Sequence, residues 1–376
     1  MPNNTKAFLE LVRAGLWEKE VRLLSHGEVD CKEVMRLAEE QSVVGLVAAG
    51  IDRIIDSRED ELAIPLDMKL QFIGQTMQIE QRNRTMNAFI ENLYGRMQKI
   101  GLYSILMKGQ GIAQCYERPL WRTAGDIDLL FNGHTYDKAK EYFDDLGQIS
   151  ESELHLKKHI TYTVNGWDVE LHGTMRGELG RRIEKGIDDA QRDIFNGGNV
   201  RLWYNGNISV FLPSADNDVI FIFTHILQHF FRGGIGLRQI CDWCRLLWTY
   251  RSELDLQELE SRIRKMGLLS EWKAFAAFVV EYLGMPVEAM PMYSPAKCHA
   301  WKAKKIFDYV IVVGNFGHNR DMSYKTEKPF LVRMIISLRY RTSDFMKQVV
   351  VFPKDAIRAY WYIWMTGLSV VLKWRR

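Results

Sequence analysis

Residues 125–131 read Gly-Asp-Ile-Asp-Leu-Leu-Phe, and the fold that the sequence indicates depends on this stretch. Side chains alternate between the two faces of a strand, so Asp126 and Asp128 share one face while Ile127 and Leu129 point into the core. Two carboxylates about 7 Å apart repel each other unless a positive charge lies between them. A divalent cation meets that demand, and Mg²⁺ commonly joins carboxylates to substrate phosphates. The alternative is an exposed strand face with two solvated aspartates.

A second polar strand follows a strong hairpin signal. Residues 160–164 and 167–172 flank Asn165-Gly166, a residue pair typical of two-residue hairpin turns. In the later strand one face carries three polar side chains, namely Asp168, Glu170 and His172. Glu170 is therefore a candidate third carboxylate opposite the first two, and together they would form a site for two metal ions.

The apolar run before the aspartates ends in a basic residue. Residues 105–109 read Ile-Leu-Met-Lys-Gly, and a short helix over 110–116 and a loop with Arg122 occupy the space before Asp126. A turn at Lys108-Gly109 that leads into a helix offers backbone N–H donors to phosphate. Lys108 and Arg122 are candidates for neutralising phosphate charge. The alternative is that both form ion pairs with the aspartates.

Helical patterns dominate the rest of the chain. Apolar periodicity predicts a long helix over about 67–99 and several more helices after Pro213. An amphipathic helix is expected at 135–146, and a second hairpin at 200–211 around Asn205-Gly206. We therefore expect an α+β, predominantly helical protein with a small mixed sheet. Its expected parts are an N-terminal helical region (1–100), an α/β domain (101–212) and a C-terminal helical domain (213–376).

Pairs of polar residues four apart occur on two of the expected C-terminal helices. His225 and His229 have the spacing of paired metal ligands, but Ile226 stands where a zinc-protease motif has Glu. Histidines of the core, or facing an active site, are the interpretation that we favour. Arg238 and Asp242 are candidate contacts of a nucleotide or an acceptor, with an ion pair as the alternative.

The residues that carry these motifs resemble a known family. They are similar to the signature of a largely uncharacterised bacterial group of nucleotidyltransferases in the DNA polymerase β-like superfamily. The matching residues are 106–109 (Leu-Met-Lys-Gly), Tyr116, Arg122, 126–130 (Asp-Ile-Asp-Leu-Leu) and 169–172 (Val-Glu-Leu-His). The resemblance extends over about residues 70–250, and the small sheet would be of the nucleotidyltransferase type. The Gly-Ser pair usual in that superfamily is replaced here by Lys108-Gly109.

The resemblance implies an enzyme that moves an NMP from Mg-NTP, with ATP the first choice, to a hydroxyl group of an unidentified acceptor and releases pyrophosphate. It implies that Asp126 and Asp128 hold the Mg²⁺ or Mn²⁺ of the nucleotide. Glu170 joins them in holding a second ion and helps to deprotonate the acceptor hydroxyl. The candidate nucleotide-binding residues are Lys108, Gly109, Arg122, Arg238 and Asp242. A second hypothesis is a module that binds Mg-NTP without transferring it, which the missing Gly-Ser pair suggests.

Charge is unevenly distributed along the 376 residues, although 50 Lys and Arg against 47 Asp and Glu give a net charge of only +3. Residues 296–376 hold 16 basic and 5 acidic side chains, a net of +11, and the remainder is at −8. The small total argues against a dedicated nucleic-acid surface. We expect some of five cations to approach the cleft, namely Lys297, Lys302, Lys304, Lys305 and Arg320. A third hypothesis is peripheral binding of a polyanion or a membrane surface through this basic third and an aromatic helix around 360–365.

No sequence feature suggests export or a membrane span. The N-terminus lacks an apolar signal-peptide core, and five scattered cysteines are too few for a disulfide framework. The longest uncharged apolar stretch, residues 359–372, would reach about 21 Å as a helix, short of the ~30 Å core of a bilayer. A cytoplasmic protein is the expectation. Cys241 and Cys244 fall inside an expected helix, which favours packing residues over zinc ligands.

Overall fold

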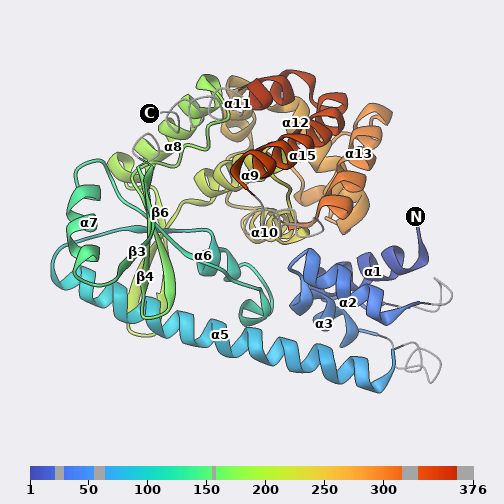
Figure 1. Cartoon of the computed structure of the whole chain (residues 1–376), viewed down its shortest axis with the longest axis horizontal. Coiled ribbons are helices and arrows are strands. Elements are labelled where there is room, and N and C mark those ends of the chain that lie inside the picture. Colours follow the sequence, from blue (N-terminus) through green and yellow to red (C-terminus); the bar gives the residue numbers. More distant parts are fainter. Residues whose placement is uncertain (22–28, 55–63, 155–157, 316–328, 362–376) are drawn as a thin grey trace.

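The computed structural model describes residues 1–21, 29–54, 64–154, 158–315 and 329–361. Within these residues, helices surround a sheet of seven strands in the order β3-β4-β5-β2-β1-β7-β6 (Figure 1). β2 pairs in parallel with β5, and β1 with β7, while the other neighbours are antiparallel. The expected α+β, predominantly helical fold with a small mixed sheet flanked by helices is confirmed.

The sheet and its connections occupy the middle of the chain. The strands are β1 (Ile105–Met107), β2 (Ile127–Leu130), β3 (Gln148–Leu154), β4 (His159–Val164), β5 (Trp167–His172), β6 (Val200–Asn205) and β7 (Ile208–Pro213). The helices between them are α6 (Gly109–Ala113), η2 (Pro119–Trp121), α7 (Tyr136–Asp144) and α8 (Arg181–Gly197). α6 ends earlier than the predicted 110–116, while the helix predicted at 135–146 is confirmed as α7.

Helix α5 (Leu66–Lys99) connects the N-terminal helices to the sheet, as Figure 1 shows. The N-terminal helices are α1 (Asn3–Trp17), α2 (Cys31–Glu40) and α3 (Val44–Ile51). Met68 and Phe72, early in α5, belong to the core that these helices share, whereas Met86, Ile90 and Tyr94 belong to a second core beneath the sheet. The long helix predicted at 67–99 is confirmed, and its two halves serve two different cores.

The two hairpins differ in how well the sequence predicted their turns. In the first, Val164 pairs with Trp167, so Asn165-Gly166 forms the two-residue loop as expected, with φ values of 50° and 80°. In the second, Asn205 pairs with Ile208, so the loop residues are Gly206 and Asn207 rather than Asn205-Gly206. The first loop position has a positive φ in both hairpins, and here Gly206 occupies it with a φ of 59°.

Two elements of the structure have no counterpart among the predicted ones. β3 is an edge strand rich in exposed polar residues, so it lacks the apolar alternation by which strands are found. α8 buries only a narrow stripe on an otherwise charged helix, formed by Ile183, Ile187, Ala190 and Ile194. A stripe spaced by three and four residues is the expected signature of such a helix, so this element was open to prediction from the sequence.

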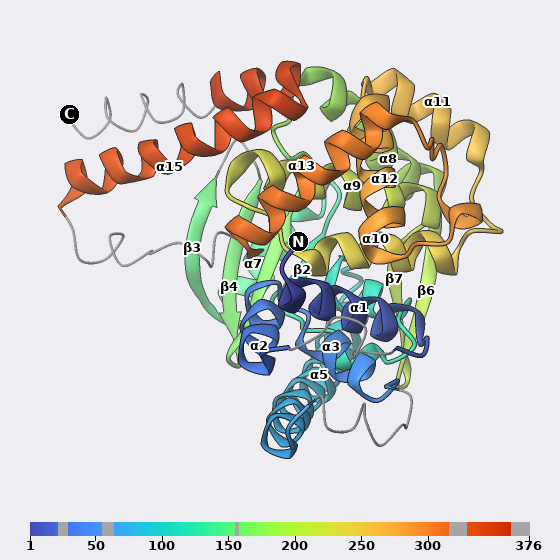
Figure 2. The ribbon, with the colours of Figure 1, turned by 90° about the vertical axis from the view of Figure 1, so that its right-hand side faces the viewer.

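The C-terminal helices build the larger core. They are α9 (Ala215–Arg232), α10 (Leu237–Thr249), α11 (Leu256–Met266), α12 (Leu269–Leu283), η3 (Val287–Ala289), α13 (Lys297–Val313), α15 (Phe330–Val351) and a helical segment at 353–361. α15 extends beyond the other C-terminal helices in Figure 2. Cys241 and Cys244 are fully buried free thiols, which confirms their interpretation as packing residues. Most of the aromatic helix predicted around 360–365 lies outside the described residues.

The two faces of the sheet have different partners. One face is apolar and packs on α5 and α7, through residues such as Ile127, Leu129 and Val169. The opposite face carries Asp128 and Glu170 toward α9 and α10. Among the described residues, no helix is long and apolar enough to cross a membrane.

Candidate active site

The pocket between the polar face of the sheet and helices α9 and α10 has a volume of about 390 Å³. This size falls in the ordinary range for small-ligand sites. It is lined by every residue that the sequence singled out for catalysis, metal binding or nucleotide binding, namely Lys108, Gly109, Arg122, Asp126, Asp128, Glu170, Arg238 and Asp242. Residues from the sheet and from two later helices therefore meet in one concave site.

The register of the central strands brings the carboxylates together. Asp128 on β2 is the direct partner of Glu170 on β5, and Asp126 lies just before β2 begins. Their apolar neighbours Ile127 and Val169 point to the opposite face, where they are buried. The alternation predicted for both strands thus explains why these carboxylates share one side of the sheet.

Basic side chains lie among these carboxylates. Lys108 Nζ is 2.7 Å from Asp128 Oδ1, and His172 Nε2 lies 2.9 Å from the same oxygen. Glu170 Oε2 is 3.3 Å from His172 Nε2 and 3.2 Å from His159 Nε2. Lys108 therefore forms an ion pair with an aspartate, which was the alternative to a phosphate contact.

The pKa values of these groups reflect that crowding. Burial acts to raise the pKa of Glu170, but the contacts with His159 and His172 and the charge of Lys108 lower it below its ordinary value. Burial acts to lower the pKa of Lys108, but Asp128 and Glu170 raise it. Glu170 is accordingly ionised and Lys108 charged near neutral pH.

Asp126 behaves in the opposite way. Burial, followed by the charges of Asp128 and Glu170, raises the pKa of Asp126 to about 6. Both effects disfavour the ionised form, since burial separates the carboxylate from water and like charges repel it. A cation bound at this end of the pocket would offset both effects.

A second polar group closes another wall of the pocket. Arg122 donates to both carboxylate oxygens of Asp242, with Nε–Oδ1 and Nη2–Oδ2 distances of 2.7 Å, and Tyr116 donates its hydroxyl to Oδ1 at 2.8 Å. All three residues are buried. Arg122 thus pairs with the aspartate of α10 rather than with Asp126 or Asp128.

Arg238, one turn before Asp242 on α10, does not form the ion pair that its spacing suggested. Its Nη1 donates to the carbonyl of Thr123 at 3.1 Å, and its Nε is buried without a hydrogen-bond partner. Burial and the neighbouring charge of Arg122 lower the pKa of Arg238. No carboxylate in the described part of the chain forms a salt bridge with it, so this guanidinium presents an unneutralised cation to the pocket.

The turn from β1 into α6 brings backbone close to the aspartates. Lys108 and Gly109 have φ values of 54° and 45°, in the left-handed region. A Cβ atom at position 109 would lie 3.6 Å from the carbonyl oxygen of Asp126. This φ favours glycine at position 109, where the chain turns past the carboxylates.

Helix α9 contributes two histidines to the same pocket. His225 Nε2 and His229 Nε2 lie 3.1 Å apart, and both rings line the cavity. Burial, together with the charge of Lys108, lowers the pKa of both rings, that of His229 to about 4. They are neutral near pH 7, and of the open interpretations the structure supports histidines that face the pocket.

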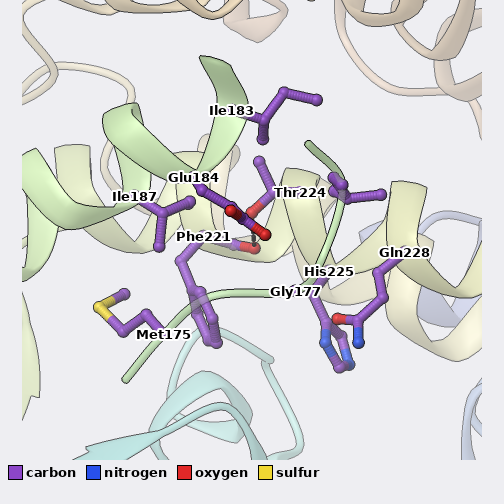
Figure 3. Close-up of a pocket in the computed structure, with 10 residues that line it drawn as sticks. Met175, Gly177, Ile183, Glu184, Ile187, Phe221, Thr224, His225 and Gln228 are labelled. Atoms are coloured by element: carbon purple, nitrogen blue, oxygen red, sulfur yellow. Dashed lines mark hydrogen bonds between the residues drawn. The ribbon is translucent and has the colours of Figure 1, made fainter. Parts of the chain in front are cut away.

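A small second cavity adjoins the first, and Figure 3 shows the residues that line it. It lies between α8 and α9, and Met175, Phe221, His225 and Gln228 belong to the walls of both cavities. Its volume of about 10 Å³ gives room for roughly one water molecule. The carboxylate of Glu184 points into this space in Figure 3.

His159 is a pocket residue that the sequence reasoning missed. It begins β4 and pairs directly with His172 on β5, where the two rings stack with centroids 4.7 Å apart. The signal was present, because counting back from the Asn165-Gly166 turn on each side pairs these two positions. The predicted strand began one residue too late, at 160, and so excluded it.

The basic C-terminal residues do not line the pocket in the part of the chain that the structure describes. Lys302 Nζ contacts Ser270 Oγ at 2.8 Å, and Lys304 pairs with Asp308 on its own helix. Lys297 and Lys305 are likewise absent from the lining, so the expectation for these four lysines is wrong. α13 packs on α12 and on α15, away from the sheet. Arg320 lies outside the described residues.

Comparison with known proteins assigns the chain to a family. Residues 27–284 match the model of a family described as uncharacterised nucleotidyltransferase, a wider range than the expected 70–250. Among solved structures, an antigenic nucleotidyltransferase-like protein from Paracoccidioides brasiliensis is 14% identical, with 54% of this chain and 93% of that chain covered and a TM-score of 0.32. A TM-score this low supports no conclusion about the chain, and no curated protein matches the sequence. The family match covers well over half of the residues and spans the whole pocket, so the chain belongs to this family of nucleotidyltransferases.

Proposed function

We propose that the protein transfers a nucleoside monophosphate from an NTP, with ATP the first candidate, to a hydroxyl group of an acceptor. The observation that carries this proposal is the convergence of Asp126, Asp128 and Glu170 in one pocket with the cations Lys108 and Arg238. Carboxylates and cations that line one pocket suit a nucleotide that arrives with a divalent cation. Membership of a nucleotidyltransferase family supports the reaction class.

The residues of the pocket fit a divalent cation. Burial, followed by the charges of Asp128 and Glu170, raises the pKa of Asp126, and a bound cation would favour its ionised form. Carboxylate oxygens are ligands that Mg²⁺ and Mn²⁺ accept. We propose that Asp126 and Asp128 hold the ion of the nucleotide and that Glu170 helps to hold a second. Bound there, the ions would polarise the phosphate and ease ionisation of the acceptor hydroxyl.

The reaction breaks one bond for each that it forms. The acceptor oxygen bonds to the α-phosphorus, the bond from this phosphorus to the bridging oxygen of the β-phosphate breaks, and pyrophosphate leaves. Glu170, which is ionised, accepts a hydrogen bond from the acceptor hydroxyl and helps to deprotonate it as a ligand of the second ion. The proton passes to solvent water, because the lowered pKa of Glu170 makes this carboxylate a weak base. Lys108 and Arg238 donate to phosphate oxygens, Arg238 through the Nε that has no protein partner.

We assign structural or pocket-lining roles to the remaining predicted residues. The Arg122–Asp242 pair holds the start of the loop before Asp126 against α10, since each charge satisfies the other. Gly109 keeps the turn after Lys108 narrow beside the carbonyl of Asp126. The neutral rings of His225 and His229 line the opposite side, where the acceptor would lie.

The proposal is tested with α-³²P-labelled NTPs, Mg²⁺ and a bacterial extract as the source of acceptors. We expect a labelled product with the wild type, none with Asp128→Asn, and the wild-type product with Asp145→Asn, which changes an exposed carboxylate outside the pocket. Equal labelling by Asp128→Asn and the wild type would overturn the assignment of the site. A labelled product also identifies the preferred base and the class of acceptor.

The main alternative is a protein that binds Mg-NTP without transferring it, and the Lys108–Asp128 ion pair favours it, since it occupies a carboxylate oxygen. Nucleotide-dependent thermal stabilisation without turnover on any acceptor would support this alternative. The proposal includes a location in the bacterial cytoplasm, because this compartment supplies both NTP and Mg²⁺.

A further inference from the structure

Three ligand atoms from β4 and β5 converge beside the aspartates. They are His159 Nε2, Glu170 Oε2 and His172 Nε2, and all lie within 4.8 Å of one another. Glu170 Oε2 is 3.2 Å from the first nitrogen and 3.3 Å from the second. Neighbouring ligands on one ion, each at about 2.0–2.2 Å from it, are separated by about 3 Å. Two of the three separations already have this value.

The backbone holds these atoms in place. His159 and His172 are direct partners in the antiparallel β4–β5 pair, and their rings stack with 16° between the planes. β5 lies between β2 and β4 in the sheet, so Glu170 and His172 have a paired strand on either side. Ligands on paired strands keep their relative positions better than ligands on loops, which favours a site that is formed before the ion arrives.

One of the nitrogens lacks a satisfying partner. His159 Nε2 is enclosed and makes no hydrogen bond of acceptable geometry, although it lies close to the carboxylate of Glu170. An enclosed polar atom without a partner is uncommon and calls for an explanation. A cation between the two imidazoles and the carboxylate would coordinate this nitrogen, and its positive charge would pair with the carboxylate of Glu170.

We propose that His159, Glu170 and His172 form a binding site for a first-row transition cation of the Mn²⁺, Co²⁺ or Zn²⁺ type. Imidazole nitrogens favour these ions, whereas Mg²⁺ prefers oxygen ligands and retains its water. The neighbouring pair Asp126 and Asp128 offers oxygen alone and keeps its preference for Mg²⁺. Three protein ligands leave coordination positions open toward the pocket for water or an acceptor oxygen.

The inference deepens the proposed function and rests on it in taking Glu170 as a ligand of the acceptor-side ion. It assigns that ion a different chemical class from the ion of the nucleotide. Binding of the metal itself requires neither a nucleotide nor an acceptor, so it is measurable on the full-length protein alone.

The test is a titration of the metal-free protein with Co²⁺, followed by visible absorption and by calorimetry. We expect one Co²⁺ per chain at this site, at least about 100-fold tighter than Mg²⁺, with d–d bands of mixed nitrogen and oxygen coordination. His159→Ala is expected to weaken Co²⁺ binding at least tenfold. The matched control, His134→Ala, removes an exposed histidine outside the pocket and should bind like the wild type.

A second variant keeps the test decisive if His159→Ala does not fold. His159→Cys retains a ligand atom, so it should still bind Co²⁺ and add a thiolate-to-cobalt charge-transfer band in the near ultraviolet. Equal Co²⁺ affinity of His159→Ala and His134→Ala, or displacement of Co²⁺ by an equal concentration of Mg²⁺, would overturn the inference. Co²⁺ binding that depends on His159, in a protein that labels no acceptor, would support the metal site while the proposed function fails.

Discussion

The pocket has two clusters of charged side chains that differ in how completely the charges are paired. Around Asp242, one carboxylate meets Arg122 in a two-point ion pair and accepts from Tyr116, so the cluster is complete in itself. Around Asp128, three carboxylates share one lysine and two histidines, and burial together with the charges of Asp128 and Glu170 raises the pKa of Asp126 to about 6. The first cluster stabilises the fold, while the second is left with charge that a ligand can neutralise. Substitutions that remove one charge should therefore act differently in the two clusters.

The largest effect is expected at Glu170. Glu170→Gln removes a metal-binding charge and the carboxylate that orients the acceptor hydroxyl, so the proposed transfer should slow roughly 1,000-fold, equal to about 4 kcal/mol. Initial rates of labelled product formation measure it. Asp168→Asn is the matched control, because Asp168 lies on the same face of β5 but outside the pocket, bonded to Thr163. Rates for Glu170→Gln within tenfold of those for Asp168→Asn would contradict its assigned role.

The next effect is one of stability, at the complete cluster. Asp242→Asn leaves Arg122 buried without its counter-charge, and we expect unfolding in urea to lose about 3 kcal/mol. Asp308→Asn, which breaks an exposed ion pair with Lys304, is the comparison and should change stability by less than about 1 kcal/mol. Similar losses of unfolding free energy in both variants would contradict the greater importance of the buried Arg122–Asp242 pair.

A smaller effect is expected far from the pocket, where protonation removes an unfavourable buried charge. Burial, followed by the charge of Asp355, raises the pKa of Glu271 to about 7 from 4.5. The stability that this group contributes is therefore complete below about pH 4.5 and is lost as the pH rises through 7.

Glu271→Gln should accordingly stabilise the protein by about 1–2 kcal/mol at pH 8.5 and by much less at pH 5. Urea unfolding at the two pH values measures the difference, and Glu281→Gln, an exposed change on the same helix, is the control. A gain that is the same at both pH values would mean that ionisation of Glu271 is not its cause.

The smallest effect should have the opposite sign from that at Asp242. Asp126→Asn removes one of three crowded carboxylates, so in the presence of EDTA at pH 8 we expect a gain of about 1 kcal/mol, kept small because part of the Asp126 side chain is open to solvent. Chemical unfolding with and without Mg²⁺ measures it, and added Mg²⁺ should stabilise the wild type more than the variant. A loss of stability in EDTA would place Asp126 among the structural charges and end the contrast between the two clusters.

Much of the fold follows from local sequence. Apolar periodicity indicated α5, because the faces of a helix repeat at fixed intervals, and the Asn165-Gly166 pair indicated the first hairpin. β3 was missed because an exposed edge strand has no buried face to alternate. The second turn was placed one residue too early, because both Asn and Gly accept the positive φ of the first loop position and the sequence does not say which of them takes it.

For the candidate site, too, the sequence indicated one part and the tertiary structure decided the rest. Alternation indicated that Asp126 shares a face with Asp128 and that Glu170 shares a face with His172. Tertiary structure decided that both faces lie on one side of the sheet, through the β2–β5 register that pairs Asp128 with Glu170. It also decided which cation faces which anion. Lys108 meets Asp128 because β1 pairs with β2. The Arg122–Asp242 pair and the unpaired Nε of Arg238 depend on helix α10 packing against the loop before β2. Charge pairing depends on distances of a few ångströms between distant segments, and the linear sequence does not contain those distances.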